Sequence, residues 1–179
     1  MLLAKEIPHY TYDDYVHWEG RWELIGGHPI AMSPAPIPKH QRIAASLIVE
    51  FGTALKSSCK KCKVYTPLDY KIEEDTIVQP DLLIVCGEIS KKYLDFSPQL
   101  VVEILSPSTA MRDRNAKYKI YQQQSVKYYL IVDADTKRIE IYLLTNGTYT
   151  IQSLSENKFD FLLDDDCTIK IDFNEIEWD

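Results

Sequence analysis

The chain has 179 residues, 45% of them apolar, and a formal net charge of −7. This size suffices for one packed domain over residues 1–179, and the acidic balance without a long Lys/Arg stripe argues against a large non-specific grip on nucleic acid. No stretch approaches the ~20 apolar residues that cross a bilayer, and residues 1–6 are too short and too acidic for a signal peptide, so we expect a cytoplasmic protein.

The four cysteines fit that compartment as free thiols, without a disulfide framework. Cys59 and Cys62 have C-x-x-C spacing, but a zinc site would need a second pair, and neither Cys86 nor Cys167 belongs to one. A redox role is also disfavoured, because the motif follows a predicted helix instead of starting one. We interpret the cysteines as structural or incidental thiols.

The N-terminal part of the chain predicts a short helix and a β-hairpin. Residues 10–18 form the helix, with Thr11 as its cap. Apolar runs at 21–25 and 29–32 flank a Gly-Gly turn, which is typical of a hairpin. Glu23 lies in the first of these runs, where it either pairs with an arginine or points at an active site.

A long amphipathic helix is the next predicted element. Prolines make residues 33–38 a loop, and apolar residues spaced by three and four predict a helix over 39–55. His40 lies in the first turn of that helix, where its imidazole either faces the site or caps the helix. An extended run over 63–72, interrupted at Pro67, follows.

Two short apolar runs, 77–85 and 100–105, are typical of buried strands, and each carries one acid, Asp81 and Glu103. A buried ionised carboxylate is costly unless it is paired or binds a cation. Asp81 could instead cap a turn, and Glu103 could form a buried ion pair with Lys117. Taken together, the two acids favour a site for a hard cation such as Mg²⁺, which prefers oxygen ligands.

Helical spacing continues from Ser108 or Thr109, either of which can cap, to about Gln124. On this helix Asp113, Lys117 and Tyr121 are four residues apart and share one face. The first two could also be a surface ion pair worth only a few tenths of a kcal/mol.

Strands dominate the remaining chain. They are predicted at 127–132, 138–144 and 148–154, the last two joined by an Asn-Gly hairpin turn, with strand-like pieces over 161–173. The acidic run within that tail lacks the spacing of a calcium loop, so we interpret it as a turn. The whole order predicts an α/β (α+β) domain with a mixed β-sheet flanked by helices.

The two acids also carry a family resemblance. Pro80-Asp81 followed by Glu103-Ile104-Leu105 resembles the core of PD-(D/E)XK nucleases, in which acids on neighbouring strands are followed two residues later by a lysine. That last position is Leu105 here. Over about residues 10–149 the chain resembles one branch, a restriction-endonuclease family called Uma-two. The matching residues are Glu23-Leu24-Ile25-Gly26-Gly27, Met32-Ser33-Pro34-Ala35-Pro36, His40, Pro80-Asp81-Leu82, Glu103-Ile104-Leu105-Ser106-Pro107-Ser108-Thr109, Asp113, Lys117, Tyr121 and Tyr128-Tyr129-Leu130-Ile131-Val132-Asp133.

The resemblance implies a restriction-endonuclease-like fold and a site. In that branch the lysine is thought to lie on the following helix; Lys117 matches it, and Lys119 is the poorer candidate because it faces another side. Asp81 and Glu103 would hold Mg²⁺ (Mn²⁺ is possible), helped by the backbone carbonyl of Ile104, and Lys117 would position the attacking water. An accessory role falls to Glu23, with three secondary candidates, His40, Asp113 and Tyr121.

These residues predict a metal-dependent DNA endonuclease that hydrolyses phosphodiester bonds, plausibly as a homodimer because a two-fold pair of sites suits cutting of both strands. Leu105 and the acidic net charge favour an alternative, a non-catalytic nucleic-acid-binding or dimerisation module of the same fold. A magnesium-dependent hydrolase of a small substrate remains a third hypothesis.

Overall fold

The structure is a computed structural model that describes residues 7–32 and 36–179. The chain forms two compact units. Unit 1 comprises residues 1–36, 68–79 and 89–96, and unit 2 comprises 37–67, 80–88 and 97–179. The single domain expected over 1–179 stays a prediction. The expectations for residues 1–6 and for the loop at 33–35 lie outside the described residues.

Unit 1 is built on a four-stranded sheet in the order β2-β1-β5-β4. Its elements are α1 (Tyr12–Tyr15), β1 (Trp22–Ile25), β2 (His28–Ala31), β4 (Tyr70–Glu73) and β5 (Thr76–Val78). Thr11 caps α1, and positive φ angles at Gly26 (+56°) and Gly27 (+76°) close the turn between β1 and β2. The predicted short helix and hairpin are therefore confirmed.

Unit 2 is built on a six-stranded mixed sheet in the order β10-β9-β8-β7-β6-β3. Strands β7 and β8 pair in parallel, and the other neighbours pair antiparallel. The strands are β3 (Cys62–Tyr65), β6 (Leu82–Cys86), β7 (Leu100–Leu105), β8 (Tyr128–Asp133), β9 (Arg138–Thr145) and β10 (Thr148–Gln152). The three C-terminal strands of this sheet lie where the sequence predicts them.

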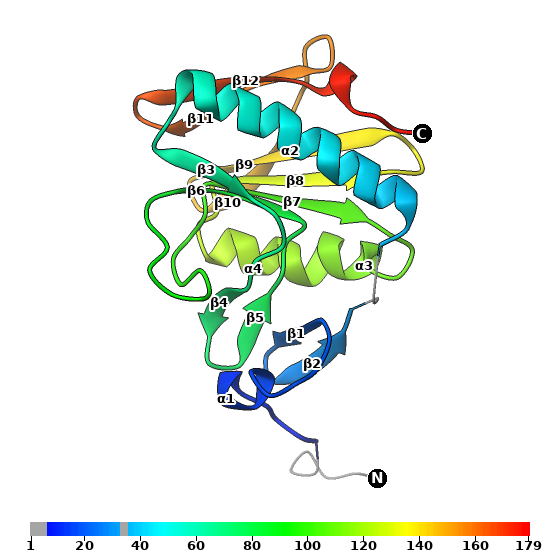
Figure 1. The fold of residues 1–179 in the computed structure, drawn as a ribbon, viewed down its shortest axis with the longest axis vertical. Helices are drawn as coiled ribbons and strands as arrows, with labels where there is room; N and C mark the ends of the chain where they lie inside the picture. The colour runs from blue at the N-terminus through cyan, green and yellow to red at the C-terminus, as the bar shows by residue number, and fades with distance from the viewer. Residues whose placement is uncertain (1–6, 33–35) are drawn as a thin grey trace. The chain divides into compact units, whose positions relative to one another are not determined.

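Helices cover both faces of this sheet (Figure 1). The long helix α2 (Pro38–Ser58) packs on one face, where apolar residues at even positions of the strands, such as Val102 and Leu130, join its own apolar stripe in one core cluster. On the opposite face run α3 (Ala110–Arg112), a π-helical segment η2 (Asp113–Lys117) and α4 (Tyr118–Gln123). The predicted fold class, a mixed sheet flanked by helices, is confirmed.

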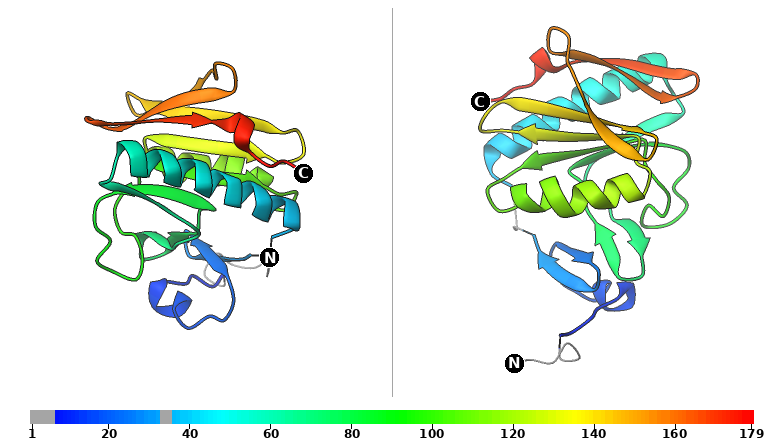
Figure 2. Two further views of the ribbon diagram at one scale, coloured as in Figure 1. Left: turned by 45° about the horizontal axis from the view of Figure 1, so that its top comes forward. Right: turned by 180° about the vertical axis from the view of Figure 1, so that it is seen from behind.

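A two-stranded sheet, β11 (Lys158–Asp164) and β12 (Cys167–Asp172), packs beside α2 and is followed by a short 3-10 helix, η3 (Phe173–Glu175) (Figure 2). The rings of Phe51 and Phe161 meet with centroids 5.7 Å apart. The predicted turn over the acidic run connects these two strands.

Two predicted strands are each divided between two sheets. The run 77–85 contains β5 and β6, separated at Gln79, Pro80 and Asp81, because Pro80 offers no N–H to a ladder and restricts the residue before it. Asp81 therefore lies just before a strand and not within one. The run 63–72 is likewise divided at Pro67 into β3 and β4.

The expectation of free thiols is wrong for this structure. All four cysteines are paired, Cys59 with Cys167 and Cys62 with Cys86. Cys62 and Cys86 face each other across the β3–β6 ladder, whereas the other pair is separated by 108 residues. Sequence spacing carries no signal for either pair, since both depend on the sheet register and on where β12 packs.

Within the described residues, no helix is long and apolar enough to cross a membrane.

Candidate functional site

The register between β6 and β7 sets the positions of the two acids. Leu82 pairs with Val102 at the end of this antiparallel ladder. Extending the register by one residue, backwards on β6 and forwards on β7, sets Asp81 opposite Glu103. Directly opposite residues on antiparallel strands point to the same face of the sheet, with Cα atoms roughly 4.5–5.5 Å apart. The two acids therefore occupy neighbouring backbone positions at the end of this ladder.

Asp81 connects the end of β6 to β7 and to α2. Its Oδ2 accepts a hydrogen bond of 2.8 Å from the backbone N–H of Ile104, and His40 Nε2 lies 3.3 Å from the same oxygen. A strand residue directs its N–H and C=O to the same neighbour, so the carbonyl of Ile104 also faces this edge. The Asp81 side chain is 16% exposed, which leaves it within reach of solvent.

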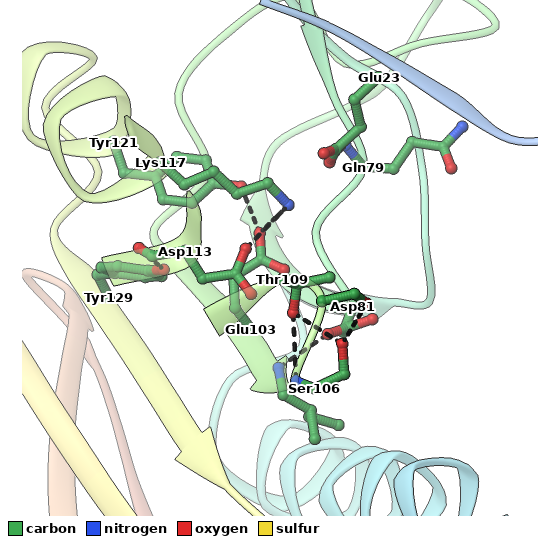
Figure 3. A network of polar contacts seen from close by, with 12 residues as sticks. Glu23, Gln79, Asp81, Glu103, Ser106, Thr109, Asp113, Lys117, Tyr121 and Tyr129 are labelled. Carbon is green, nitrogen blue, oxygen red and sulfur yellow. Dashed lines mark hydrogen bonds and ion pairs between the residues drawn. The ribbon is translucent and has the colours of Figure 1, made fainter. Parts of the chain in front are cut away.

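Glu103 lies in the middle of β7 and is 3% exposed. Its Oε1 accepts hydrogen bonds from Lys117 Nζ at 2.9 Å and from the Tyr121 hydroxyl at 2.7 Å (Figure 3). An ammonium and a phenol, both delivered by the crossover between β7 and β8, thus contact one carboxylate oxygen. Glu103 and Lys117 therefore form the buried ion pair that is the alternative to a metal site.

Asp113 completes this group from the preceding turn of the same crossover. Its Oδ1 lies 3.6 Å from Lys117 Nζ, and both side chains are 2% exposed. The interpretation as a surface ion pair is therefore wrong, because the pair is buried under the sheet. Asp113 and Lys117 are the two ends of η2, and π-helical turns often occur at functional sites.

Tyr129 is a member of this group that the sequence reasoning missed. Its hydroxyl donates a 2.8 Å hydrogen bond to the backbone carbonyl of Asp113. Burial raises the pKa of Tyr129 well above its usual value, and the negative charges of Glu103 and Asp113 add to that effect. Side-chain alternation along β8 could have indicated its position. Tyr129 and Ile131 point to one face of the sheet, and Leu130 points to the opposite, apolar core face.

Glu23 belongs to unit 1 and is fully buried in β1. Its Oε1 accepts a 2.8 Å hydrogen bond from the backbone N–H of Gln79, and the Gln79 side chain in turn accepts from Arg21 Nε at 3.3 Å. Within its own unit Glu23 therefore fastens β1 to the segment that leaves β5. Lys119, the poorer candidate for the site lysine, is exposed on α4.

The donor set of unit 2 suits a hard divalent cation. Glu103 and Asp113 share the buried ammonium of Lys117, and Asp81, held by the Ile104 N–H and close to His40, stands at the neighbouring end of β6. Carboxylate and carbonyl oxygens are the ligands that Mg²⁺ and Mn²⁺ prefer. Removing such charges from water is expensive, so an excess of carboxylates on these elements favours a cation beside them.

The chain is similar to a known protein family, to a relative in sequence and to a solved structure. The family model Uma2, described as "Putative restriction endonuclease", matches residues 12–167. An uncharacterized protein, slr1290, from Synechocystis sp. is 29% identical over 145 residues, which cover 75% of this chain and 74% of the relative. The crystal structure of a protein from Anabaena variabilis, titled a putative nuclease belonging to DUF820, is similar with a TM-score of 0.68 and 18% identity. That match covers 82% of this chain and 86% of the other.

Proposed function

Because this chain belongs to the Uma2 family of putative restriction endonucleases, we propose that it is a metal-dependent DNA endonuclease that hydrolyses phosphodiester bonds. One observation carries the proposal. Asp81 directly precedes Leu82 of β6, Glu103 directly follows the residue of β7 that pairs with Leu82, and a lysine from the following helix lies 2.9 Å from Glu103. Two acids and a lysine are the groups of a PD-(D/E)XK nuclease core. Leu105 stands where that core has its lysine, and Lys117 on the following helix would supply the ammonium group instead.

Asp81, Glu103 and the carbonyl of Ile104 would hold Mg²⁺, or Mn²⁺ in its place. Bound there, the cation would supply positive charge beside the phosphate oxygens and would make a water molecule more acidic. The hydrogen bond from the Ile104 N–H holds the Asp81 carboxylate against β7, so this ligand needs little reorganisation.

Lys117 positions the attacking water and offsets charge that develops on the phosphate. Tyr121 and Asp113 orient Lys117. Tyr121 donates to the same Glu103 oxygen as Lys117 does, and the Asp113 carboxylate faces the Lys117 ammonium. His40 holds Asp81 from the α2 side.

Nicking of supercoiled plasmid DNA tests this function. The native chain is incubated with Mg²⁺ or Mn²⁺, alongside Asp81→Asn, which keeps the shape of the side chain and removes its charge. We expect nicking by the native chain and a loss of about 10²–10³-fold in the variant, the usual cost of removing one electrostatic contributor to a transition state. Native-level nicking by Asp81→Asn would refute the site.

Two lysines on one helix provide a matched control. Lys117→Met removes the buried ammonium, and Lys119→Met removes an exposed ammonium two residues away. Nicking should fall with the first change and persist with the second. Both variants are first checked for native circular dichroism, so that a loss of folding is not mistaken for a loss of activity.

The buried Glu103–Lys117 pair also favours a second function, a non-catalytic nucleic-acid-binding or dimerisation module of the same fold. In that function the pair and the Tyr121 hydrogen bond stabilise the sheet and do no chemistry. Binding of labelled duplex DNA without nicking under any divalent cation would favour it. Hydrolysis of a model phosphodiester without action on DNA would instead indicate a small substrate.

A homodimer is part of the proposal, because duplex cleavage suits two sites related by a two-fold axis. Sedimentation velocity of the native chain with and without duplex DNA measures it directly.

A further inference from the structure

The four cysteines gather at one place in unit 2. Cys59 is the C-cap of α2, Cys62 begins β3, Cys86 ends β6 and Cys167 begins β12. Three of them, Cys59, Cys62 and Cys167, are at most 5% exposed, and their sulfur atoms all lie within 4.8 Å of one another. Three sulfurs therefore share one small volume, and Cys86 is joined to it through its bond to Cys62.

Sulfur atoms of different disulfides are as close as ligands of one metal ion. The Sγ atoms of Cys59 and Cys62 are 3.3 Å apart, and those of Cys62 and Cys167 are 3.7 Å apart. In a tetrahedral site with Zn–S bonds of about 2.3 Å, ligand sulfurs are separated by about 3.8 Å. Two disulfides that only cross-link the chain have no need to meet at this spacing.

We propose that this cysteine cluster, once its disulfides are reduced, binds one Zn²⁺ through Cys59, Cys62 and Cys167, with Cys86 as the fourth ligand. Each disulfide takes up two electrons and two protons to give two thiols, and each thiol releases its proton when it ligates the ion. A phosphine supplies the electrons: it attacks one sulfur, and water then converts it to the phosphine oxide. The disulfide-bonded and zinc-bound forms exclude each other.

The local chain supports ligation. Cys59 to Cys62 forms a tight turn in which the Cys62 N–H donates to the Cys59 carbonyl at 3.3 Å, so the turn holds both sulfurs on one side. Lys61, inside the turn, lies 2.8 Å from Asp164 and also contacts Asp166, the residue just before Cys167. This ion pair draws the C-x-x-C turn towards the start of β12.

The local charge also fits. Four thiolates around Zn²⁺ carry a net charge of −2, and Cys62 lines a pocket together with three lysines, Lys56, Lys60 and Lys63. Those ammonium groups offset the negative charge of the centre.

Cobalt and zinc titrations of the full chain test the proposal. The protein is reduced with a carboxylated phosphine, or refolded from the fully reduced state, and freed of metal by a chelator. Co²⁺ is then added as the spectroscopic probe, followed by Zn²⁺. We expect one equivalent of Co²⁺ to give thiolate charge-transfer absorption and the intense visible bands of tetrahedral geometry, and one equivalent of Zn²⁺ to remove both.

Two variants locate the bound ion. Cys62→Ser should lower the thiolate-ligated Co²⁺, measured by its charge-transfer absorption, from one equivalent to none, while Asp81→Asn, at the acid site, should leave that equivalent unchanged. The native titration stands even if Cys62→Ser does not fold. A reduced native chain with four reactive thiols but no Co²⁺–thiolate absorption overturns the proposal, as does absorption that disappears in Asp81→Asn.

Discussion

The two ends of strand β6 differ in the chemistry that they present. Asp81 directly precedes the strand and contacts nitrogen groups of Ile104 on β7 and His40 on α2, whereas Cys86 is the last residue of β6 and belongs to the cysteine cluster. Four strand residues lie between Asp81 and Cys86, which places their backbone positions roughly 17 Å apart. Oxygen donors select Mg²⁺ or Mn²⁺, and thiolates select Zn²⁺.

Burial has different consequences at the two ends of β6. At the acid end, charged groups are withdrawn from water and depend on one another, so that removal of one leaves another uncompensated. At the sulfur end, neutral disulfides tolerate burial without a partner charge, and their contribution comes from the chain segments that they join. Stability should therefore respond to different changes at each end.

Removal of the Cys59–Cys167 link should have the largest effect on stability. Its ends are 108 residues apart, against 24 for Cys62–Cys86. Chain entropy then predicts losses of about 4.8 and about 3.4 kcal/mol in the free energy of unfolding. Urea denaturation of the double alanine variant of each pair measures both losses. A larger loss for the Cys62–Cys86 variant would show that chain entropy does not determine what the disulfides contribute to stability.

Lys117→Met should lower the free energy of unfolding by about 3–5 kcal/mol, because Glu103 and Asp113 lose the buried ammonium that they share. Lys119→Met, on the exposed side of α4, should change it by no more than about 0.5 kcal/mol. Urea denaturation at neutral pH measures both. Equal effects would mean that the acid end does not depend on Lys117.

Two tyrosines allow a hydrogen bond to a charged acceptor to be compared with one to a neutral acceptor. Tyr121 donates to the Glu103 carboxylate at 2.7 Å, and Tyr149 donates to the backbone carbonyl of Val126 at 2.8 Å. We expect Tyr121→Phe to cost about 1.5–3 kcal/mol and Tyr149→Phe about 1 kcal/mol, since hydrogen bonds to charged groups are the stronger ones. Thermal unfolding of both variants provides the comparison, and the reverse order would contradict a charged Glu103.

The smallest effect is expected at the Arg114–Glu140 pair, which ties η2 to β9 through two hydrogen bonds of 2.8 and 2.9 Å. The Arg114 guanidinium lowers the pKa of Glu140 below its usual value of 4.5. A lowered folded-state pKa means that the stabilisation is present above about pH 4.5 and is lost as the pH falls through the folded value.

Arg114 is 38% exposed, so solvent screening limits the pair to less than about 1 kcal/mol. Arg114→Met should differ from the native chain by that amount at pH 7, and the difference should shrink towards pH 3. Urea denaturation at both pH values measures it. A difference that grows on acidification would reverse the assigned sign.

Most elements follow from local pattern. The long helix α2, the hairpins β1–β2 and β9–β10, and strands β7 and β8 lie where apolar periodicity and glycine turns predict them. Periodicity also predicts which side chains of α3–η2–α4 share a face, because neighbours four apart meet on any helical surface. These features depend on interactions between residues close in the chain.

Other features depend on segments that are distant in sequence. Pro80 interrupts an apolar run, but only the packing shows that β5 and β6 belong to different sheets and that Asp81 precedes its strand. The contact between His40 and Asp81 and the hydroxyl of Tyr129 on Asp113 likewise require the layers to be assembled.

The two acids and the helix-borne lysine can be picked out along the chain, because each is marked by its own apolar or helical surroundings. The convergence of four scattered cysteines cannot, since it depends on the β3–β6 register and on where β12 packs against α2. Local patterns encode faces of elements, and the register between elements comes from the burial of those faces against one another.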